Sequence, residues 1–136
     1  MIVLETVNLK KYYGVEPNIT KALDGINFTV EKGEFVAIVG TSGSGKSTLL
    51  NMIGGLDRPT SGIVKIQGKN LLELNDEQLT IFRRRNIGFI FQNYNLIESL
   101  TIKNNILFSL RLNNVDQKTQ LEKLMPLAKM LNIDEI

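Results

Sequence analysis

A glycine-rich run between two apolar segments constrains this chain more than any other feature. Residues 40–48 read Gly-Thr-Ser-Gly-Ser-Gly-Lys-Ser-Thr and fit the pattern G-x-x-x-x-G-K-[ST]. The run before it, Glu34–Val39, is rich in β-formers and predicts a strand buried on both faces. The apolar residues after it recur at helical spacing, at Leu49, Leu50, Ile53 and Leu56. The sequence therefore predicts strand, loop and helix in that order, with Gly54 near the end of the helix.

The residue types of this loop suit a chain of phosphate groups. Glycines let backbone N–H groups approach phosphate oxygens, and the start of a helix adds unpaired N–H groups and a positive dipole. Lys46 would supply charge to the outer phosphates, and the Ser47 hydroxyl can ligate Mg²⁺. The predicted phosphate-binding residues are Gly40, Thr41, Ser42, Gly43, Ser44, Gly45, Lys46, Ser47 and Thr48. The alternative is a glycine-rich turn in an ordinary strand-to-helix connection.

Composition excludes several other kinds of chemistry. The 136 residues contain no cysteine and no histidine, so neither a cysteine metal site nor a histidine base can be built from this chain. Its length suits one domain, with 43% apolar and 22% charged residues. A net charge of +2 is too small to indicate nucleic acid, and none is expected as a partner. No apolar run approaches the length of a membrane span, and the N-terminus lacks the pattern of a signal peptide.

Strand patterns dominate the first half of the chain and helical patterns the second. The expected strands are residues 2–9 (at a sheet edge), 26–30, 63–67 and 87–91, with a loop over residues 11–21. Asn75, with Gln78 three residues later, predicts a capped helix that runs to about Arg85. Helical spacing resumes at Thr101, and Pro126 is expected to end or kink the last helix.

Four features in order make the chain resemble the nucleotide-binding domain of ATP-binding cassette (ABC) transporters. They are the phosphate loop, the lead Ala22–Ile26, the turn Leu56–Gly62 and the pair Phe91-Gln92. The resemblance implies an α/β fold: a phosphate-loop NTPase core, with a parallel sheet and flanking helices, plus N-terminal antiparallel strands and the start of a helical subdomain. It also implies ATP and Mg²⁺ as cofactors.

The resemblance assigns roles to two further residues. Tyr13 stands where the family places an aromatic residue that stacks on adenine, and Tyr12 competes for this role. Gln92 matches the glutamine that reaches Mg²⁺ and the attacking water, so the predicted metal ligands are Ser47 and Gln92. A strand-end glutamine bonded to backbone is the alternative for Gln92. For the basic run Arg83–Arg85, a solvated helix end is favoured over a phosphate or partner contact.

Part of the chain resembles one subfamily in particular. Residues 82–92, followed by Asn95–Ile97, are similar to bacterial ATPases that export or extract lipoproteins, macrolides and antimicrobial peptides. Asn104 departs from that pattern, because the subfamily usually has an acidic residue there. Two domains are predicted. Residues 1–96 would form the ATPase core, with the phosphate loop and the loop at Gln92 (the Q-loop of the family), and residues 97–136 the beginning of the helical subdomain.

Three family motifs are missing from this sequence. It has no Leu-Ser-Gly-Gly-Gln signature, no apolar strand ending in Asp-Glu and no switch histidine, and Asp134-Glu135 follows a helical segment instead. No catalytic residue is therefore assigned to this chain. We expect it to be the N-terminal portion of an ATP hydrolase and to hydrolyse little ATP alone.

The resemblance also implies partners and a location. We expect membrane permease subunits, a second ATP-binding domain, and a cytoplasmic position at the inner face of the cell membrane. Three alternatives stay open: a soluble ABC-type ATPase, a GTPase or small-molecule kinase, and a nucleotide-binding stub without hydrolysis. Against a GTPase, Lys103-Asn104-Asn105 does not supply the guanine-reading Asn-Lys-x-Asp.

Overall fold

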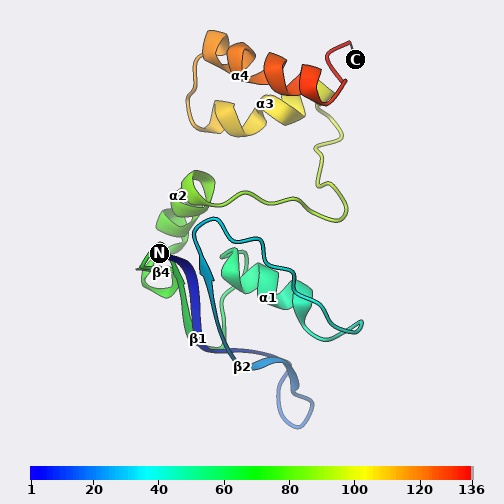
Figure 1. The fold of residues 1–136 in the computed structure, drawn as a ribbon. Coiled ribbons are helices and arrows are strands. Elements are labelled where there is room, and N and C mark those ends of the chain that lie inside the picture. Colours follow the sequence, from blue (N-terminus) through cyan, green and yellow to red (C-terminus); the bar gives the residue numbers. More distant parts are fainter. Residues whose placement is uncertain (136) are drawn as a thin grey trace. The chain divides into compact units, whose positions relative to one another are not determined.

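The computed structural model describes residues 1–135 and divides the chain into two compact units (Figure 1). The first unit contains residues 1–89, with a β-sheet and two α-helices, and the second begins at residue 90 and contains two more. Each unit is described by itself.

An antiparallel sheet of four strands forms the first unit, in the order β2-β1-β3-β4. The strands are β1 (Ile2–Tyr13), β2 (Thr20–Glu31), β3 (Ser61–Ile66) and β4 (Lys69–Asn70). The prediction of an edge strand over residues 2–9 is wrong, because β1 pairs with β2 on one side and with β3 on the other. Both flanking strands also lengthen into the expected loop, which shrinks to residues 14–19.

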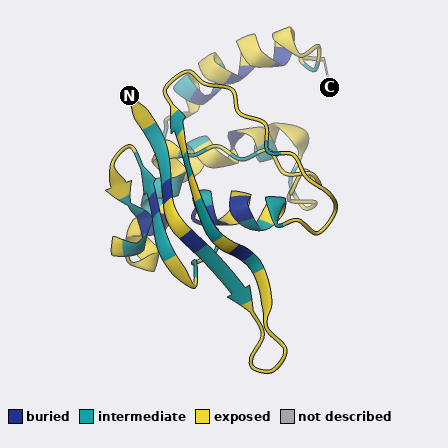
Figure 2. Cartoon of the chain, turned by 60° about the horizontal axis from the view of Figure 1, so that its bottom comes forward, coloured by how far each residue is buried: buried dark blue, intermediate teal, exposed yellow. Residues whose placement is uncertain are grey.

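Helix α1 (Lys46–Ile53) supplies the apolar side chains that meet the sheet. Leu9 of β1 is completely buried, and Val64 of β3 is 1% exposed. Figure 2 colours the buried positions dark blue, and bands of this colour lie along the strands. The buried core of this unit is Leu9, Leu23, Leu49, Met52, Val64, Leu71 and Leu79.

Two apolar runs that predicted buried strands form no strand within residues 1–135. In residues 34–39, Phe35 is 98% exposed and Val39 is 87% exposed, although Ile38 packs against the core. In residues 87–91, Ile90 is fully exposed. A strand needs a neighbour to pair its backbone groups, and the described residues give these runs none. The α/β class with N-terminal antiparallel strands is confirmed, whereas parallel pairing is not observed among the described residues.

The capped helix appears where the sequence predicts it. Helix α2 spans Asp76–Asn86, after the short helix η1 (Leu71–Glu73). Asn75 Oδ1 accepts a hydrogen bond from Gln78 N at 2.9 Å, and Gln78 Oε1 accepts one from Asn75 N at 3.1 Å. This reciprocal pair satisfies two backbone donors that the helix itself cannot pair, so it fixes where the helix begins.

The second unit is a pair of helices, α3 (Ile102–Leu112) and α4 (Gln117–Met130). Thr101 and Asp116 cap their starts by accepting backbone hydrogen bonds. Leu107, Leu124 and Ala128 are buried in this unit. Of the two outcomes expected at Pro126, an end of the helix does not occur: α4 continues to Met130, so the single lost N–H is tolerated within this helix. Within residues 1–135, none of the helices has the length and apolar character that crossing a membrane requires.

Candidate functional site

Three glycines shape the loop between residues 40 and 46. Gly43 and Gly45 have φ angles of 78° and 88°, a region that residues with a side chain rarely adopt. A side chain at Gly45 would also collide with the carbonyl oxygen of Ala22 in β2. A Cβ atom at Gly40 would lie 2.5 Å from Ser44 Oγ. Backbone conformation therefore favours glycine at Gly43 and Gly45, and a side chain at Gly40 would require the Ser44 hydroxyl to move. The close approach of Gly45 to Ala22 also places the loop against β2.

The Lys46 side chain folds back over this loop. Its ammonium group donates to the carbonyl oxygens of Gly40 and Thr41, at 2.9 and 2.6 Å, and to Ser44 Oγ at 3.2 Å. All three acceptors belong to the loop, so the positive charge lies within the ring that the loop forms. Phosphate oxygens can replace these neutral acceptors with charged ones, which make stronger hydrogen bonds.

The start of α1 completes the cradle. Gly45 is the N-cap of this helix, no side chain of the described residues caps it, and its first turn holds no acidic residue. The first N–H groups of a helix have no partner within the helix, and they carry its partial positive charge. Ser47 is exposed in this turn, so its hydroxyl can reach a ligand. These features fit an anion and an accompanying cation better than an ordinary strand-to-helix turn.

A magnesium ion at this loop would not be held by a cluster of acidic side chains. Within residues 1–135, no group of three or more carboxylate, histidine or cysteine side chains could hold a metal ion. The donor set near the loop is the neutral hydroxyl of Ser47, which suits Mg²⁺ when phosphate oxygens supply the negative charge.

Tyr13 ends β1, where it pairs with Thr20 of β2. Its phenol donates a hydrogen bond to Asp57 Oδ2 at 3.3 Å, and the Lys11 ammonium lies 4.9 Å from its ring centroid. The residue is 43% exposed. A flat ring that is both held and exposed is able to stack on a planar ligand.

Tyr12 is held differently. Its hydroxyl donates to Asp24 Oδ1, and Lys21 lies 5.3 Å from its ring centroid. The hydrogen bond to Asp24 is the main cause that raises the pKa of Tyr12, and the same bond lowers the pKa of Asp24. Both tyrosines thus have carboxylate partners.

The tyrosine pair lies near the loop. Gly45 contacts Ala22, and Ala22 is two residues from Thr20, the strand partner of Tyr13. Strand geometry then places Tyr13 roughly 10 Å from the start of α1, at about 3.4 Å per residue and about 5 Å between strands. The loop and Tyr13 are therefore brought together in the first unit.

The sequence did not single out Lys11 and Asp57 as site residues. Lys11 Nζ lies 2.8 Å from Asp57 Oδ2, beneath the ring of Tyr13. Asp57 belongs to the turn that the resemblance drew on, but only the structure shows what its carboxylate contacts. The sequence did contain one sign of this contact: Lys11 stands two residues before Tyr13, and alternate residues of a strand share a face.

Gln92 belongs to the second unit, in the segment before α3. Tyr94 and Asn95 follow it with positive φ angles, so the backbone turns sharply there. Asn105 of α3 ties down the end of this segment: its side chain exchanges hydrogen bonds with the backbone N–H and carbonyl of Ile97, at 2.8 and 3.1 Å. Gln92 therefore begins a structured connection.

The basic run Arg83–Arg85 ends α2. Arg83 donates to the Gly55 carbonyl at 3.0 Å and to Thr80 Oγ1 at 3.2 Å. Arg83 thus fastens α2 to the turn after α1. Arg84 and Arg85 are exposed, as expected for a basic helix end.

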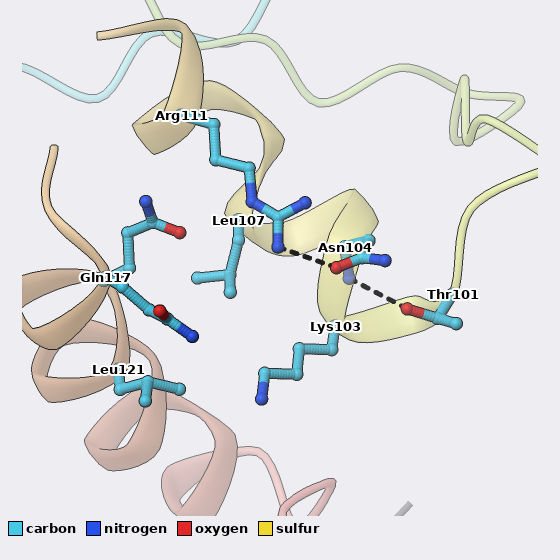
Figure 3. A pocket seen from close by; sticks show the side chains of 8 residues that line it. Thr101, Lys103, Asn104, Leu107, Arg111, Gln117 and Leu121 are labelled. Carbon is cyan, nitrogen blue, oxygen red and sulfur yellow. Dashed lines mark hydrogen bonds between the residues drawn. The ribbon is translucent and has the colours of Figure 1, made fainter. Parts of the chain in front are cut away.

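The second unit has a polar pocket of its own, of about 640 Å³, between α3 and α4. Figure 3 shows its basic side chains, Lys103 and Arg111, with Arg111 donating to Asn104 Oδ1 at 2.8 Å. Thr101, Leu107, Gln117, Gln120 and Leu121 complete the lining. This polar pocket of the second unit therefore carries positive charge and amide groups.

Comparison with known proteins gives a family match over most of the chain. The family described as ABC transporter matches residues 23–135. The bacitracin export ATP-binding protein BceA of Halalkalibacterium halodurans is 45% identical over 136 residues, which are all of this chain and 54% of that protein. The macrolide export ATP-binding/permease protein MacB of Hyphomonas neptunium is 50% identical over 103 residues, 76% of this chain and 16% of that protein.

Solved structures agree with these matches. A dimeric post-hydrolysis state of the ATP-binding cassette MJ0796, bound to ADP and Pi, superposes with a TM-score of 0.86 at 39% identity. The match covers 93% of this chain and 56% of the solved one. The chain thus spans about half the length of BceA and of this cassette. The resemblance predicted from the ordered motifs is confirmed.

Proposed function

Since this chain belongs to the ABC transporter family, we propose that it is the ATP-binding part of a transport ATPase and that residues 40–48 hold the phosphates of Mg-ATP. The observation that carries this proposal is the position of the Lys46 ammonium, bound to three loop oxygens beside the uncapped start of α1. A positive charge, free helical N–H groups and glycine backbone meet there, and phosphate needs all three.

The site residues then divide the ligand between them. The backbone of Gly40–Gly45 and the Lys46 ammonium would bind the phosphates, and Tyr13 would stack on the adenine. Ser47 would hold Mg²⁺, which when bound neutralises phosphate charge during phosphoryl transfer. The family resemblance implies Gln92 as a further ligand. Gln92 offers a neutral amide oxygen, which can ligate without adding charge. Residues 1–96 would form the ATPase core and residues 97–136 the beginning of the helical subdomain.

The names of two relatives support a direction of transport. BceA is named for bacitracin export and MacB for macrolide export, and this chain is 45% and 50% identical to them over the matched residues. We therefore propose a role in export or extraction, driven through membrane permease subunits at the cytoplasmic face of the membrane. The exposed apolar side chains of the second unit, such as Leu127, Met130 and Leu131, support a partner there.

A second copy of the ATP-binding domain completes this proposal. MJ0796 was solved as a dimer with ADP and Pi bound. A dimer would place two nucleotide sites between two domains. ATP hydrolysis belongs to that assembly, and the 136-residue chain alone should hydrolyse ATP slowly, since no general base or catalytic carboxylate is assigned to it.

Calorimetric titration of the chain with MgATP tests the binding role. Lys46→Ala should weaken MgATP binding by about a hundredfold, since it removes a charge-assisted contact to phosphate. Lys65→Ala is the matched control: it removes a lysine that binds a carboxylate, Glu5, in the same sheet. Equal affinities of Lys46→Ala and the unmodified chain would overturn the proposal. Tighter binding of MgGTP than MgATP would favour the GTPase alternative.

A further inference from the structure

One carboxylate in the first unit gathers two side chains from β1. Asp57 Oδ2 lies 2.8 Å from Lys11 Nζ and accepts a hydrogen bond from Tyr13 Oη at 3.3 Å. The Lys11 ammonium also donates to the Arg58 carbonyl at 2.8 Å. Asp57, Lys11 and Tyr13 therefore form a connected cluster, which we refer to as the Tyr13 clamp.

The ion pair in the clamp is unusually well covered for a lysine. The Lys11 side chain is only 14% exposed, and that of Asp57 is 40% exposed. A covered ammonium group is costly unless a carboxylate and further acceptors surround it, and Asp57 and the Arg58 carbonyl do so here. The Lys11 hydrogen bond is also the main cause that lowers the pKa of Asp57, so this carboxylate is ionised at neutral pH.

Two hydrogen bonds of Thr60 hold the clamp in place. Thr60 Oγ1 accepts a hydrogen bond from Tyr12 N, and Thr60 N donates one to the Lys10 carbonyl, both at 2.9 Å. These two bonds fasten the 57–60 turn to β1 on either side of Lys11. The position of Asp57 relative to Tyr13 is thus set by one main-chain bond and one bond to the Thr60 hydroxyl.

The clamp also orients the ring. The Lys11 ammonium lies 4.9 Å from the centroid of Tyr13, within the range of a cation–π contact on a ring face. One face is thereby covered by the lysine, so a planar ligand has the opposite face to stack on. A ring that is already fixed loses less conformational entropy when a ligand stacks on it.

We propose that Lys11 and Asp57 are positioning residues that hold the Tyr13 ring ready to receive the base of the bound nucleotide. This inference rests on the proposed function of residues 40–48 and Tyr13, and it adds the two residues that hold the ring. The clamp lies roughly 10 Å from the start of α1 by strand geometry, a separation that a nucleotide spans between its base and its phosphates. Lys11 and Asp57 act through Tyr13 and contact no ligand themselves.

The experiment compares a ligand that has a base with one that lacks it. MgATP and magnesium tripolyphosphate are titrated calorimetrically into the full chain and into its variants Lys11→Met and Asp57→Asn. Each variant removes one charge and nearly preserves the shape of the side chain. Both should bind MgATP about threefold to tenfold more weakly, since one charge-assisted contact to the ring is lost, and tripolyphosphate within twofold of the unmodified chain. Lys65→Met, which breaks the Lys65–Glu5 pair of the same sheet, should change neither ligand.

Two further variants separate positioning from general damage. Lys11→Arg keeps the charge and should retain most of the MgATP affinity. In a Tyr13→Ala background, Lys11→Met should change MgATP affinity by less than twofold, because there is no ring left to position. Equal losses for both ligands, or no loss of MgATP affinity, would overturn the inference. A wrong proposed function gives another pattern: Lys46→Ala then leaves both ligands unchanged, and the inference falls with it.

Discussion

The strands of the sheet and the two apolar runs that form no strand, residues 34–39 and 87–91, have similar residue types but opposite environments. β1 and β3 bury Leu9 and Val64 almost completely. Residues 34–39 are at least as rich in β-formers, yet Phe35 and Val39 lie almost fully exposed. The difference is the neighbour: β1 pairs with β2 and β3, whereas the described residues supply no strand to residues 34–39 or 87–91. A run of apolar β-formers predicts a segment that tends to be buried in a sheet. Whether it is buried depends on a neighbouring strand with which it can pair.

The same comparison explains how the phosphate loop keeps its shape. The loop follows the unpaired run, but its contacts come from elsewhere. Gly45 packs against Ala22 of β2, and Leu49 of α1 is buried in the core. The paired part of the molecule therefore holds the loop, and the run before it contributes chiefly Ile38. A site can be built although one of its flanking segments lacks its strand neighbours.

The largest expected effect tests the comparison directly. Leu9→Ala should lower the free energy of unfolding by about 3 kcal/mol, since it leaves a cavity in a closed core. Val39→Ala should change it by less than about 0.5 kcal/mol, because that side chain is 87% exposed. Urea unfolding followed by circular dichroism measures both. Similar losses for the two variants would mean that residues 34–39 are covered in solution, and the contrast would then fail.

The next effect tests whether residues 87–91 contact the end of α1. A Cβ atom at Gly54 would collide with the ring of Phe89, so this ring lies directly on the end of α1. Gly54→Ala should therefore cost about 2 kcal/mol of unfolding free energy by overpacking. Gly88→Ala is the matched control, because a Cβ there meets nothing within 4 Å and its φ is not positive; it should stay within about 0.5 kcal/mol.

A double variant sharpens that test. Phe89→Ala removes the ring that Gly54→Ala would strike, so the two costs should be less than additive. Full additivity would show that Phe89 does not rest on Gly54. The end of α1 would then not be a contact site for residues 87–91.

A smaller effect concerns an element that depends on local sequence alone. Asn75→Ala should destabilise the first unit by about 1 kcal/mol, because it removes the N-cap of α2. Asn75→Asp should retain most of that stability, since a carboxylate can accept the same hydrogen bond. Chemical unfolding of the unmodified chain and of the two variants measures these differences in the free energy of unfolding. A loss for Asn75→Asp as large as that for Asn75→Ala would contradict a capping role.

These contrasts show which parts of the molecule could be predicted from sequence. The capped start of α2 and the helix after the loop depend on residues a few positions apart, and both predictions are confirmed. The place of β1 inside the sheet depends on β3, some fifty residues away, and periodicity could not supply that pairing. Pro126 shows the limit of a local rule, since α4 continues past it to Met130 and does not end there.

The candidate site divides in the same way. The loop from Gly40 to Thr48 was found as a contiguous pattern, whose ligand roles stay predictions. The Tyr13 clamp joins Lys11 of β1 to Asp57 of a distant turn, so no contiguous pattern could reveal it. Physical contacts between remote segments are what the structure adds to the sequence.

The smallest expected effect lies at the paired end of the sheet, where two exposed side chains are coupled. Tyr12 donates to Asp24, and this bond lowers the pKa of Asp24 and raises the pKa of Tyr12 from their usual values. The contribution of Asp24 to stability is therefore complete above about pH 4 and is lost as pH falls further, whereas that of Tyr12 is lost above about pH 10. Both windows lie outside neutral pH, so stability should be nearly flat between them as far as this pair is concerned.

Carboxyl carbon NMR titration separates the phenol from the other causes. Tyr12→Phe should raise the pKa of Asp24 toward its usual value, though not fully, because Lys21 and Lys10 also lower it. Asp57 is the internal control: its pKa is lowered chiefly by Lys11, so it should not respond to Tyr12→Phe. An unchanged pKa of Asp24 in that variant would mean that β1 and β2 are not joined by this bond. The contrast between the paired strands and the unpaired runs would then depend on backbone pairing and core burial alone.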